Sequence, residues 1–414
     1  MTTSSANTKK APPPWLLGLA NLPLGLAGGL TLLTMPQWLA AQHVPEAVIA
    51  EMTTLALIPT FLVFFLGPVF DLWFSRRTYA IASTVVAAVG AFATLLAGSN
   101  HALLAAAMTL SMLGGAANYM AVGGWFGTLI AKEDDATLGA WLNIANVGGF
   151  GLMAAMGMYT IRALPAPAAG AVLAALILVP LLIYLRTTAP PPDSRLASES
   201  FGPFFRDLAA LLRKPVVLQK LLLFSVPAAS FALTNTLGGL GGDYHASEGF
   251  VSVMGGAASI GAGVIGSLLV PPLARRVPAR ALYLGIGFLG AAFTLSLIIA
   301  PRTPALFGIA MIGQNLAQCA ALATVNVVAL QSLGSDNPFA ATQFGLITCA
   351  SALPITYMQL IDGHIYGAGG LTSMYLADGG LGLLACVLMA GLLTLWARRR
   401  RSMLTFPAPS ESPS

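Results

Sequence analysis

The chain has 414 residues, of which 57% are hydrophobic and only 8% are charged, and its net charge is +5. Average soluble domains are about 25% charged, so this composition excludes an ordinary water-soluble globular protein. Apolar runs of about 20 residues recur between short charged or Gly/Pro breaks, which predicts a polytopic helical membrane protein.

The first apolar run follows a polar segment, residues 1–14, that carries Lys9 and Lys10 like the start of a signal peptide. The run continues past Gly28 to about residue 41, which is too long for a signal peptide, so we expect a spanning helix that is kept. Twelve such spans are predicted, at about residues 15–41, 48–70, 78–98, 102–131, 138–162, 167–186, 216–240, 249–273, 280–300, 304–332, 339–361 and 371–397.

The longest hydrophilic segment lies in the middle of the chain and is rich in Pro, Ser and charged residues. Such a composition is typical of a linker. We therefore expect an all-α membrane protein with two pseudo-symmetric six-helix bundles. The predicted parts are a tail at 1–14, a first bundle at 15–186, a linker at 187–215, a second bundle at 216–397 and a basic tail at 398–414.

Basic residues fall on one side of this topology. If both termini are cytoplasmic, 18 of the 20 Lys and Arg residues lie in cytoplasmic segments, and only Arg162 and Arg302 lie outside. Cytoplasmic loops of membrane proteins carry such an excess. The positive net charge therefore indicates membrane orientation, and it gives no reason to expect nucleic acid binding.

Two segments repeat between the halves. "GPVFDLWFSRR" begins at Gly67 and "GSLLVPPLARR" begins at Gly266, each after the second apolar span of its half. Matching positions in two halves are what a duplicated six-helix unit predicts, although basic pairs in cytoplasmic loops are also ordinary.

The first of these segments resembles the loop motif Gly-x-x-x-Asp-Arg-x-Gly-Arg-Arg of the major facilitator superfamily. Gly67, Asp71, Arg76 and Arg77 match it in kind, whereas Leu72 and Phe74 replace the internal Arg and Gly, and Val270 replaces the Asp in the second copy. The resemblance implies a latch at the cytoplasmic face made by the Asp and the basic residues.

The segment "PFAATQFGLITCASALPI", at residues 338–355, narrows the resemblance. Together with the residues that follow it to Trp396, it is similar to the eleventh and twelfth helices of the AmpG-type muropeptide permease and acetyl-CoA transporter branch, which includes single-component importers of ferric siderophores (FptX/RhtX-like). The short loops fit the siderophore importers better than the longer muropeptide permeases. Thr342 and Gln343 would lie near the cytoplasmic mouth, where Gln343 is a candidate gate residue.

The sequence contains no catalytic constellation, no phosphate-binding loop and no His/Cys/Asp metal set, so we expect neither an enzyme nor a cofactor. A transporter needs polar groups that face a cavity between its halves. Side-chain amides provide these without the cost of a buried charge, although they also form ordinary interhelical hydrogen bonds. The cavity candidates are Asn118, Trp125, Asn143, Asn146, Asn235, Gln314, Gln318 and Asn326.

Ionisable residues inside the spans are sparse, which gives little support to proton coupling. Asp362 and His364 are expected at a solvated helix end. We expect a monomeric inner-membrane transporter in a bacterium that imports a small solute by alternating access. A cavity lined by amide, aromatic and Met side chains favours a ferric siderophore of the pyochelin kind; a muropeptide permease of cell-wall recycling is the main alternative. A membrane sensor and a drug-efflux pump are further alternatives, disfavoured by the short tails and by the lack of a Pro in "NVGGFG".

Overall fold

The computed structural model describes residues 12–187, 206, 209–334 and 337–404. The predicted tail at 1–14, the linker at 187–215 and the end of the tail at 398–414 lie largely outside these residues. Ten helical segments are long and apolar enough to cross a membrane within the described residues. One of them, α17 (Ala340–Leu404), turns back at Gly370 and supplies two spans, and the short helix α12 (Pro215–Ser225) supplies the start of the seventh span, so the count of twelve agrees with the sequence.

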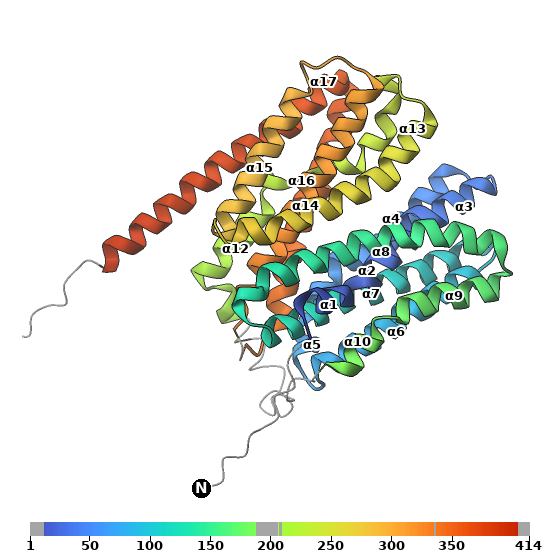
Figure 1. Ribbon diagram of the computed structural model, residues 1–414, viewed down its shortest axis with the longest axis horizontal. Helices are drawn as coiled ribbons and strands as arrows, with labels where there is room; N and C mark the ends of the chain where they lie inside the picture. The colour runs from blue at the N-terminus through green and yellow to red at the C-terminus, as the bar shows by residue number, and fades with distance from the viewer. Residues whose placement is uncertain (1–11, 188–205, 207–208, 335–336, 405–414) are drawn as a thin grey trace, which may run out of the picture.

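The first half is built from six spans that run up and down (Figure 1). Proline or glycine interrupts several of them, which a membrane bundle tolerates because neighbouring helices satisfy the freed backbone groups. The elements are α1 (Pro14–Gly18), α2 (Leu22–Gly29), a π-helical segment (Leu30–Thr34), α3 (Met35–Ala41), α4 (Glu46–Leu62), α5 (Gly67–Asp71), α6 (Arg76–Leu96), α7 (His101–Leu129), α8 (Asp135–Ala163), α9 (Ala166–Leu178) and α10 (Leu181–Arg186).

The second half contains the other six spans. After α12 and a series of 3-10 turns come α13 (Glu248–Val253), a π-helical segment (Met254–Ala258), α14 (Ser259–Ala274), α15 (Ala279–Ser296), α16 (Pro304–Leu330) and α17. Figure 1 shows the two halves meeting at one end and diverging at the other.

Small residues let the helices approach closely inside the first half. A side chain added at Gly90 of α6 would lie 2.4 Å from the backbone of Ser111 in α7, and one added at Gly114 would lie 2.3 Å from the backbone of Ala87. Close backbone packing is the main source of helix association in lipid, where the hydrophobic effect gives no net drive.

The seventh span differs from the prediction. We expected one helix over 216–240, but the helix ends at Ser225 and the chain continues as 3-10 turns at Pro227–Ala229, Ala232–Asn235 and Leu237–Tyr244. Pro227 lacks a backbone N–H and disfavours helical geometry at the preceding Val226, which is extended. The glycine pairs in "GGLGG" further weaken the helix.

The loops between spans define two ends of the molecule. The connections at 72–75, 130–134 and 275–278 share one end with the described residues that flank the gaps after 187 and after 334. We call it the basic end because most of the described Lys and Arg residues lie in or beside these connections. The four histidines lie in or beside the connections at the opposite end. The halves meet at the basic end.

Candidate transport cavity and interhalf latch

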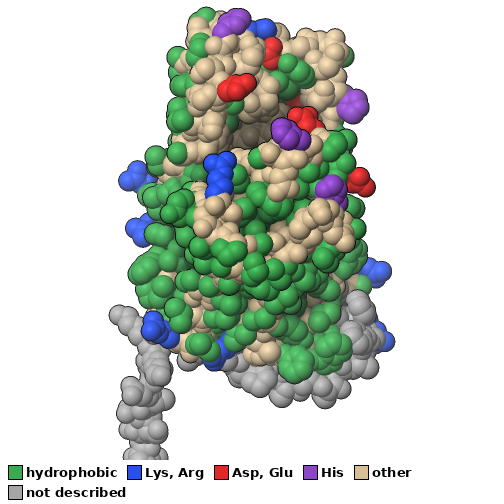
Figure 2. Space-filling model, turned by 90° about the vertical axis from the view of Figure 1, so that its right-hand side faces the viewer, with side chains coloured by type: hydrophobic (Ala, Val, Ile, Leu, Met, Phe, Trp, Pro, Cys, Tyr) green, Lys and Arg blue, Asp and Glu red, His purple; other side chains and the backbone are tan. Residues whose placement is uncertain are grey.

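A cavity of about 350 Å³ lies between the two halves and opens away from the basic end. Both halves contribute polar side chains to its wall, which is a typical arrangement for a transporter binding site. Figure 2 shows the hollow from the open side, with acidic and histidine side chains around it. The lining residues are Leu33, Asn143, Asn146, Val147, Phe150, Thr234, Asn235, Gly255, Ser259, Ile260, Asn315, Gln318, Cys319 and Leu322.

Several side-chain amides of this wall already form hydrogen bonds within the protein. Asn315 donates to the Ser259 hydroxyl (3.0 Å), Gln318 donates to the Phe231 carbonyl (3.3 Å), and Asn235 donates to the Gln359 side chain (3.1 Å). Asn146 is half-buried and its side chain makes no hydrogen bond with the described residues. Asn146 therefore keeps a full donor and acceptor set for a ligand.

The broken seventh span forms part of the C-terminal wall. Phe231 has a left-handed backbone (φ 48°), and the residues after it, Thr234 and Asn235, line the cavity. Two side chains of α17 bind carbonyls that the break leaves without helical partners: Tyr357 donates to Ser225 (2.9 Å) and Cys386 to Ala228 (3.0 Å). Discontinuous helices of this kind place backbone and polar groups at the binding sites of transporters.

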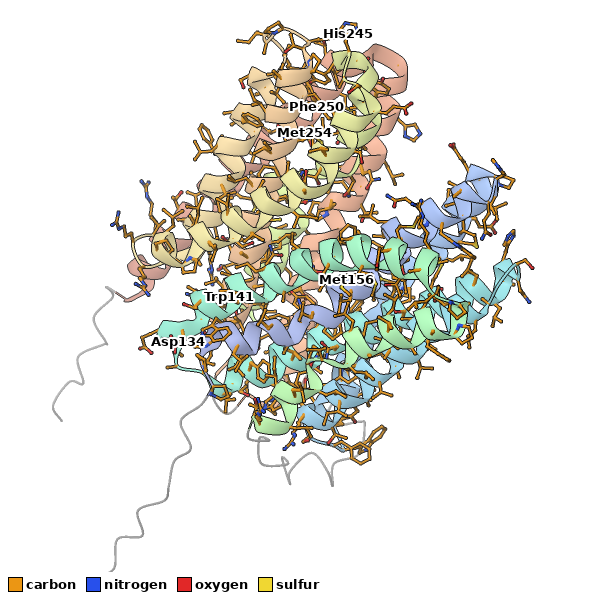
Figure 3. All side chains as sticks on the ribbon, turned by 45° about the vertical axis from the view of Figure 1, so that its right-hand side comes forward. Asp134, Trp141, Met156, His245, Phe250 and Met254 are labelled. Atoms are coloured by element: carbon orange, nitrogen blue, oxygen red, sulfur yellow. The ribbon has the colours of Figure 1, made fainter. Side chains whose placement is uncertain are left out.

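Methionine was expected in the cavity lining, together with amide and aromatic side chains. Figure 3 shows Met156 on α8 in one half and Phe250 and Met254 in the other half. The described cavity wall contains Phe150 and Cys319 but no methionine, so the expected Met lining is not found there. Phe250 and Met254 pack against the core of the second half, beside Gly308.

Hydrogen bonds between the halves close the cavity toward the basic end. Asn143 of α8 donates to the Ser267 hydroxyl (2.9 Å) and to the Cys319 carbonyl (3.2 Å) in the second half. Asn326 of α16 donates to the Gly139 carbonyl (3.2 Å) and accepts a hydrogen bond from Tyr119. The Tyr119 ring also stands edge-on to Phe344, with ring centroids 5.2 Å apart.

The basic end is sealed by one carboxylate from the first half. Asp71, at the end of α5, accepts hydrogen bonds from the backbone N–H of Ala341 (3.1 Å) and of Thr342 (2.9 Å) and from the Thr342 hydroxyl (2.7 Å). These N–H groups belong to the first turn of α17, which has no acidic residue of its own there. The negative charge therefore caps a helix of the other half and interacts with the positive end of its dipole.

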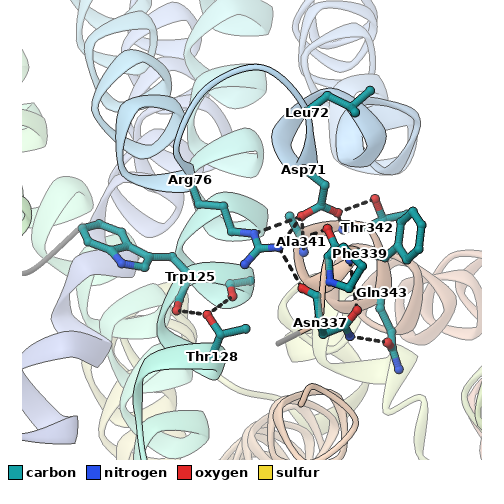
Figure 4. A network of polar contacts seen from close by, with 12 residues as sticks. Asp71, Leu72, Arg76, Trp125, Thr128, Asn337, Phe339, Ala341, Thr342 and Gln343 are labelled. Carbon is teal, nitrogen blue, oxygen red and sulfur yellow. Dashed lines mark hydrogen bonds and ion pairs between the residues drawn. The ribbon is translucent and has the colours of Figure 1, made fainter. Parts of the chain in front are cut away.

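Arg76 connects the same carboxylate to the loop before α17 (Figure 4). Its guanidinium lies 2.9 Å from Asp71 and donates to the carbonyls of Asn337 (3.0 Å) and Pro338 (3.2 Å). Gln343 binds this loop from the other side, since it accepts from Asn337 (2.8 Å) and donates to the Ser332 carbonyl (3.2 Å). We call Asp71, Arg76, Asn337, Thr342 and Gln343 the interhalf latch.

Close backbone contact surrounds the interhalf latch. A side chain at Gly67 would lie 2.9 Å from the Thr342 Cα atom, and one at Gly124 would lie 2.6 Å from the backbone of Ala341. Only glycine allows this approach, so Gly67 of the loop motif has a packing role between the halves. Arg77 is half-buried beside the latch and forms no hydrogen bond or ion pair with the described residues.

Comparisons with known proteins give the fold. No family model and no curated relative matches the chain. Solved structures do match: the proton:xylose symporter XylE (TM-score 0.71, 13% identity, 91% of this chain and 94% of that chain) and a bacterial homologue of the iron transporter ferroportin in an outward-facing state (0.67, 14%, 93% and 98%). A third is the human organic anion transporter MFSD10 (0.67, 16%, 91% and 98%).

The fold is that of the major facilitator superfamily. In this major facilitator fold the two repeated glycines, Gly67 and Gly266, have different packing partners. Gly67 packs against the other half, whereas Gly266 packs against the Leu316 carbonyl within its own half. The counterpart of α17 in the first half is α8, which carries its own acids, Asp134 and Asp135, at its start and needs none from outside.

The structure places the predicted cavity residues in three locations. Asn143, Asn146, Asn235 and Gln318 line the cavity, and Asn326 lies in the seal below it. Asn118 instead donates to Thr84 (2.9 Å) and Tyr184 (2.7 Å) inside the first half, Gln314 donates to Thr294 (2.7 Å) inside the second, and Trp125 is fully buried against Phe126. These last three lie away from the described cavity wall.

Several residues of the site carry no recognisable signal in the sequence. Ser259 and Phe150 line the cavity without a polar-spacing signal. Tyr119 and Ser332 contribute through partners far away in the chain, Asn326 and Lys220. Asp362 was expected at a solvated helix end, and this expectation is wrong. Its side chain is fully buried between the arms of α17, near Asp378, and neither of its oxygens has a hydrogen-bond partner among the described residues.

Proposed function

We propose that this chain is a secondary transporter that moves a small solute by alternating access between its two halves. The observation that carries the proposal is the pairing of a polar cavity, open at one end, with the interhalf latch that closes the other end. The major facilitator fold supports it. Transport of this kind needs no bond chemistry, so the proposed function is not enzymatic.

The distribution of charge supports an orientation. The basic end would face the cytoplasm by the positive-inside rule, with both termini there, and the cavity would then open to the outside of a bacterial inner membrane. An outward-open cavity above a closed cytoplasmic latch is the loading state of an importer. We propose import and a monomeric working unit, because one chain contains both halves of the site.

We propose a ferric siderophore as the substrate. The cavity wall offers amides, an aromatic ring and aliphatic side chains, and no Lys or Arg lines it among the described residues. Such a wall suits a compact ligand with aromatic parts and little net charge. A strongly anionic glycopeptide would be expected to bind basic side chains instead.

Uptake into spheroplasts of a deletion strain tests both the function and the substrate. We expect cells that express the protein to accumulate iron-55 supplied as ferric pyochelin, and Asn146→Ala and Gln318→Ala to reduce the rate about tenfold, as one lost hydrogen bond to substrate would. Gln42→Ala is the matched control, because Gln42 is exposed and lies outside the cavity. Uptake of labelled anhydro-muropeptide without siderophore uptake would replace our substrate with the alternative; uptake of neither would refute both.

A further inference from the structure

Two adjoining hollows lie at the basic end of the second half, away from the transport cavity. The first, about 270 Å³, is lined by Lys220, Ala274, Pro278, Ala279, Arg280, Val328 and Gln331. The second, about 390 Å³, is an apolar groove lined by Gln219, Pro278, Arg280, Ala281, Leu284, Ala390, Leu393, Thr394 and Trp396. Pro278 and Arg280 line both, so the two hollows adjoin at these residues, and we call the pair the amphipathic cleft.

The first hollow has the properties of an anion site. Lys220 is 8% exposed and lines this hollow together with Arg280, so two cationic side chains share one wall. The helix α15 begins at Ala279 in the same wall, and no side chain caps its first N–H groups. An anion here would interact with both cations and with the uncapped helix terminus.

The groove has the properties of an acyl-chain site. It runs between α12, α15 and α17, and large hydrophobic side chains on both α15 and α17 are exposed beside it, including Phe288, Leu289, Leu388 and Leu395. Surfaces of this kind in a membrane protein face lipid. Trp396 lies at the level of the basic residues, where tryptophan marks the boundary between the apolar core and the headgroups.

We propose that this cleft binds one anionic phospholipid, with its phosphate at Lys220, Arg280 and the start of α15 and one acyl chain in the groove. Both requirements of a phospholipid are met in one place: a concentrated positive charge and an adjoining apolar channel. A free phosphate would use only the first hollow, and a zwitterionic lipid would gain less from the two cations.

The cleft is linked to the interhalf latch by hydrogen bonds. Lys220 donates to the Ser332 hydroxyl, and Gln343 of the latch donates to the carbonyl of the same residue. The Lys220 ammonium has three N–H donors, so a bound phosphate and the Ser332 hydroxyl would share it. A bound lipid would therefore be connected through Lys220 and Ser332 to Gln343 of the interhalf latch.

Native mass spectrometry of the full-length, delipidated protein tests the proposal. We expect phosphatidylglycerol to bind at least about tenfold more tightly than phosphatidylcholine, and Lys220→Gln/Arg280→Gln to remove that preference. The double variant Arg275→Gln/Arg276→Gln is the matched control. It deletes two exposed charges from the connection between α14 and α15, at the same end of the protein, and should keep the preference. Ala390→Trp fills the groove without changing charge and should also weaken phosphatidylglycerol binding, which covers the case in which the charge variant does not fold.

Three results would overturn the proposal. Equal binding of the two lipids would show ordinary annular contact. An unchanged preference in Lys220→Gln/Arg280→Gln would place the anion elsewhere. Full displacement of phosphatidylglycerol by inorganic phosphate, with no effect of Ala390→Trp, would show an anion site without a lipid. None of these readouts requires transport activity, so they are independent of the proposed substrate.

Discussion

Asp71 of the first half and Thr342 of the second half are separated by 271 positions in the chain, yet the carboxylate of Asp71 accepts both the backbone N–H and the hydroxyl of Thr342, at 2.9 and 2.7 Å. One side chain thereby caps a helix that belongs to the other bundle. In the alternating-access mechanism that we propose, this contact has to break whenever the basic end opens, so its strength contributes to the balance between the two states.

Replacing Asp71 with Asn should favour opening of the basic end. The variant loses the ion pair with Arg76 and the charge at the start of α17, which together contribute about 1–3 kcal/mol. Distances between spin labels on the two halves at the basic end should lengthen in a larger fraction of molecules. Glu133→Gln, an exposed acid at the same end, is the control. An unchanged distance distribution would contradict a latch role.

Gly124→Ala should weaken the closed state through packing rather than charge. The added Cβ would lie 2.6 Å from the backbone of Ala341, and backbone cannot move away as a flexible side chain can. We expect a larger open fraction at the basic end in the same spin-label measurement. Gly148→Ala is the control, since nothing lies within 4 Å of a Cβ there. Equal behaviour of the two variants would show that the contact at Gly124 is unimportant.

Asn146→Leu and Asn118→Leu should separate binding from stability. Asn118 makes three hydrogen bonds in the buried interior, so its loss should lower the free energy of unfolding by about 2 kcal/mol. Asn146 makes none with the described residues, so its replacement should reduce uptake and leave the melting temperature nearly unchanged. Thermal unfolding in detergent and uptake assays measure the two effects. The reverse pattern would exclude Asn146 from the binding site.

Asp362→Asn should leave the protein as stable as before or more stable. The carboxylate is buried without a hydrogen-bond partner among the described residues, and a neutral amide of the same shape costs less to bury. Thermal unfolding measures this, with Glu46→Gln as an exposed control that should show no change. A clear loss of stability would reveal that the Asp362 charge has a favourable partner, such as a bound cation.

The sequence by itself determined the class and the number of spans, and it predicts their orientation. Runs of about 20 apolar residues and the one-sided distribution of Lys and Arg are local properties, and the bilayer acts on each span separately. The same holds for the break in the seventh span, because Pro227 and the glycine pairs are visible in the sequence. We predicted a continuous helix because the segment is apolar throughout, although these residues disfavour a helix.

Only the tertiary structure decided which polar residues meet. Asn118 and Asn146 look alike in the sequence, but helix rotation buries one within its own half and turns the other to the cavity. In a span that is apolar on every face, hydropathy does not report that rotation. The loop motif pointed to Asp71 and Arg76, but their partners at Asn337, Ala341 and Thr342 follow from how the two bundles dock. Docking depends on backbone contact at glycines such as Gly67 and Gly124, over separations that no local pattern encodes.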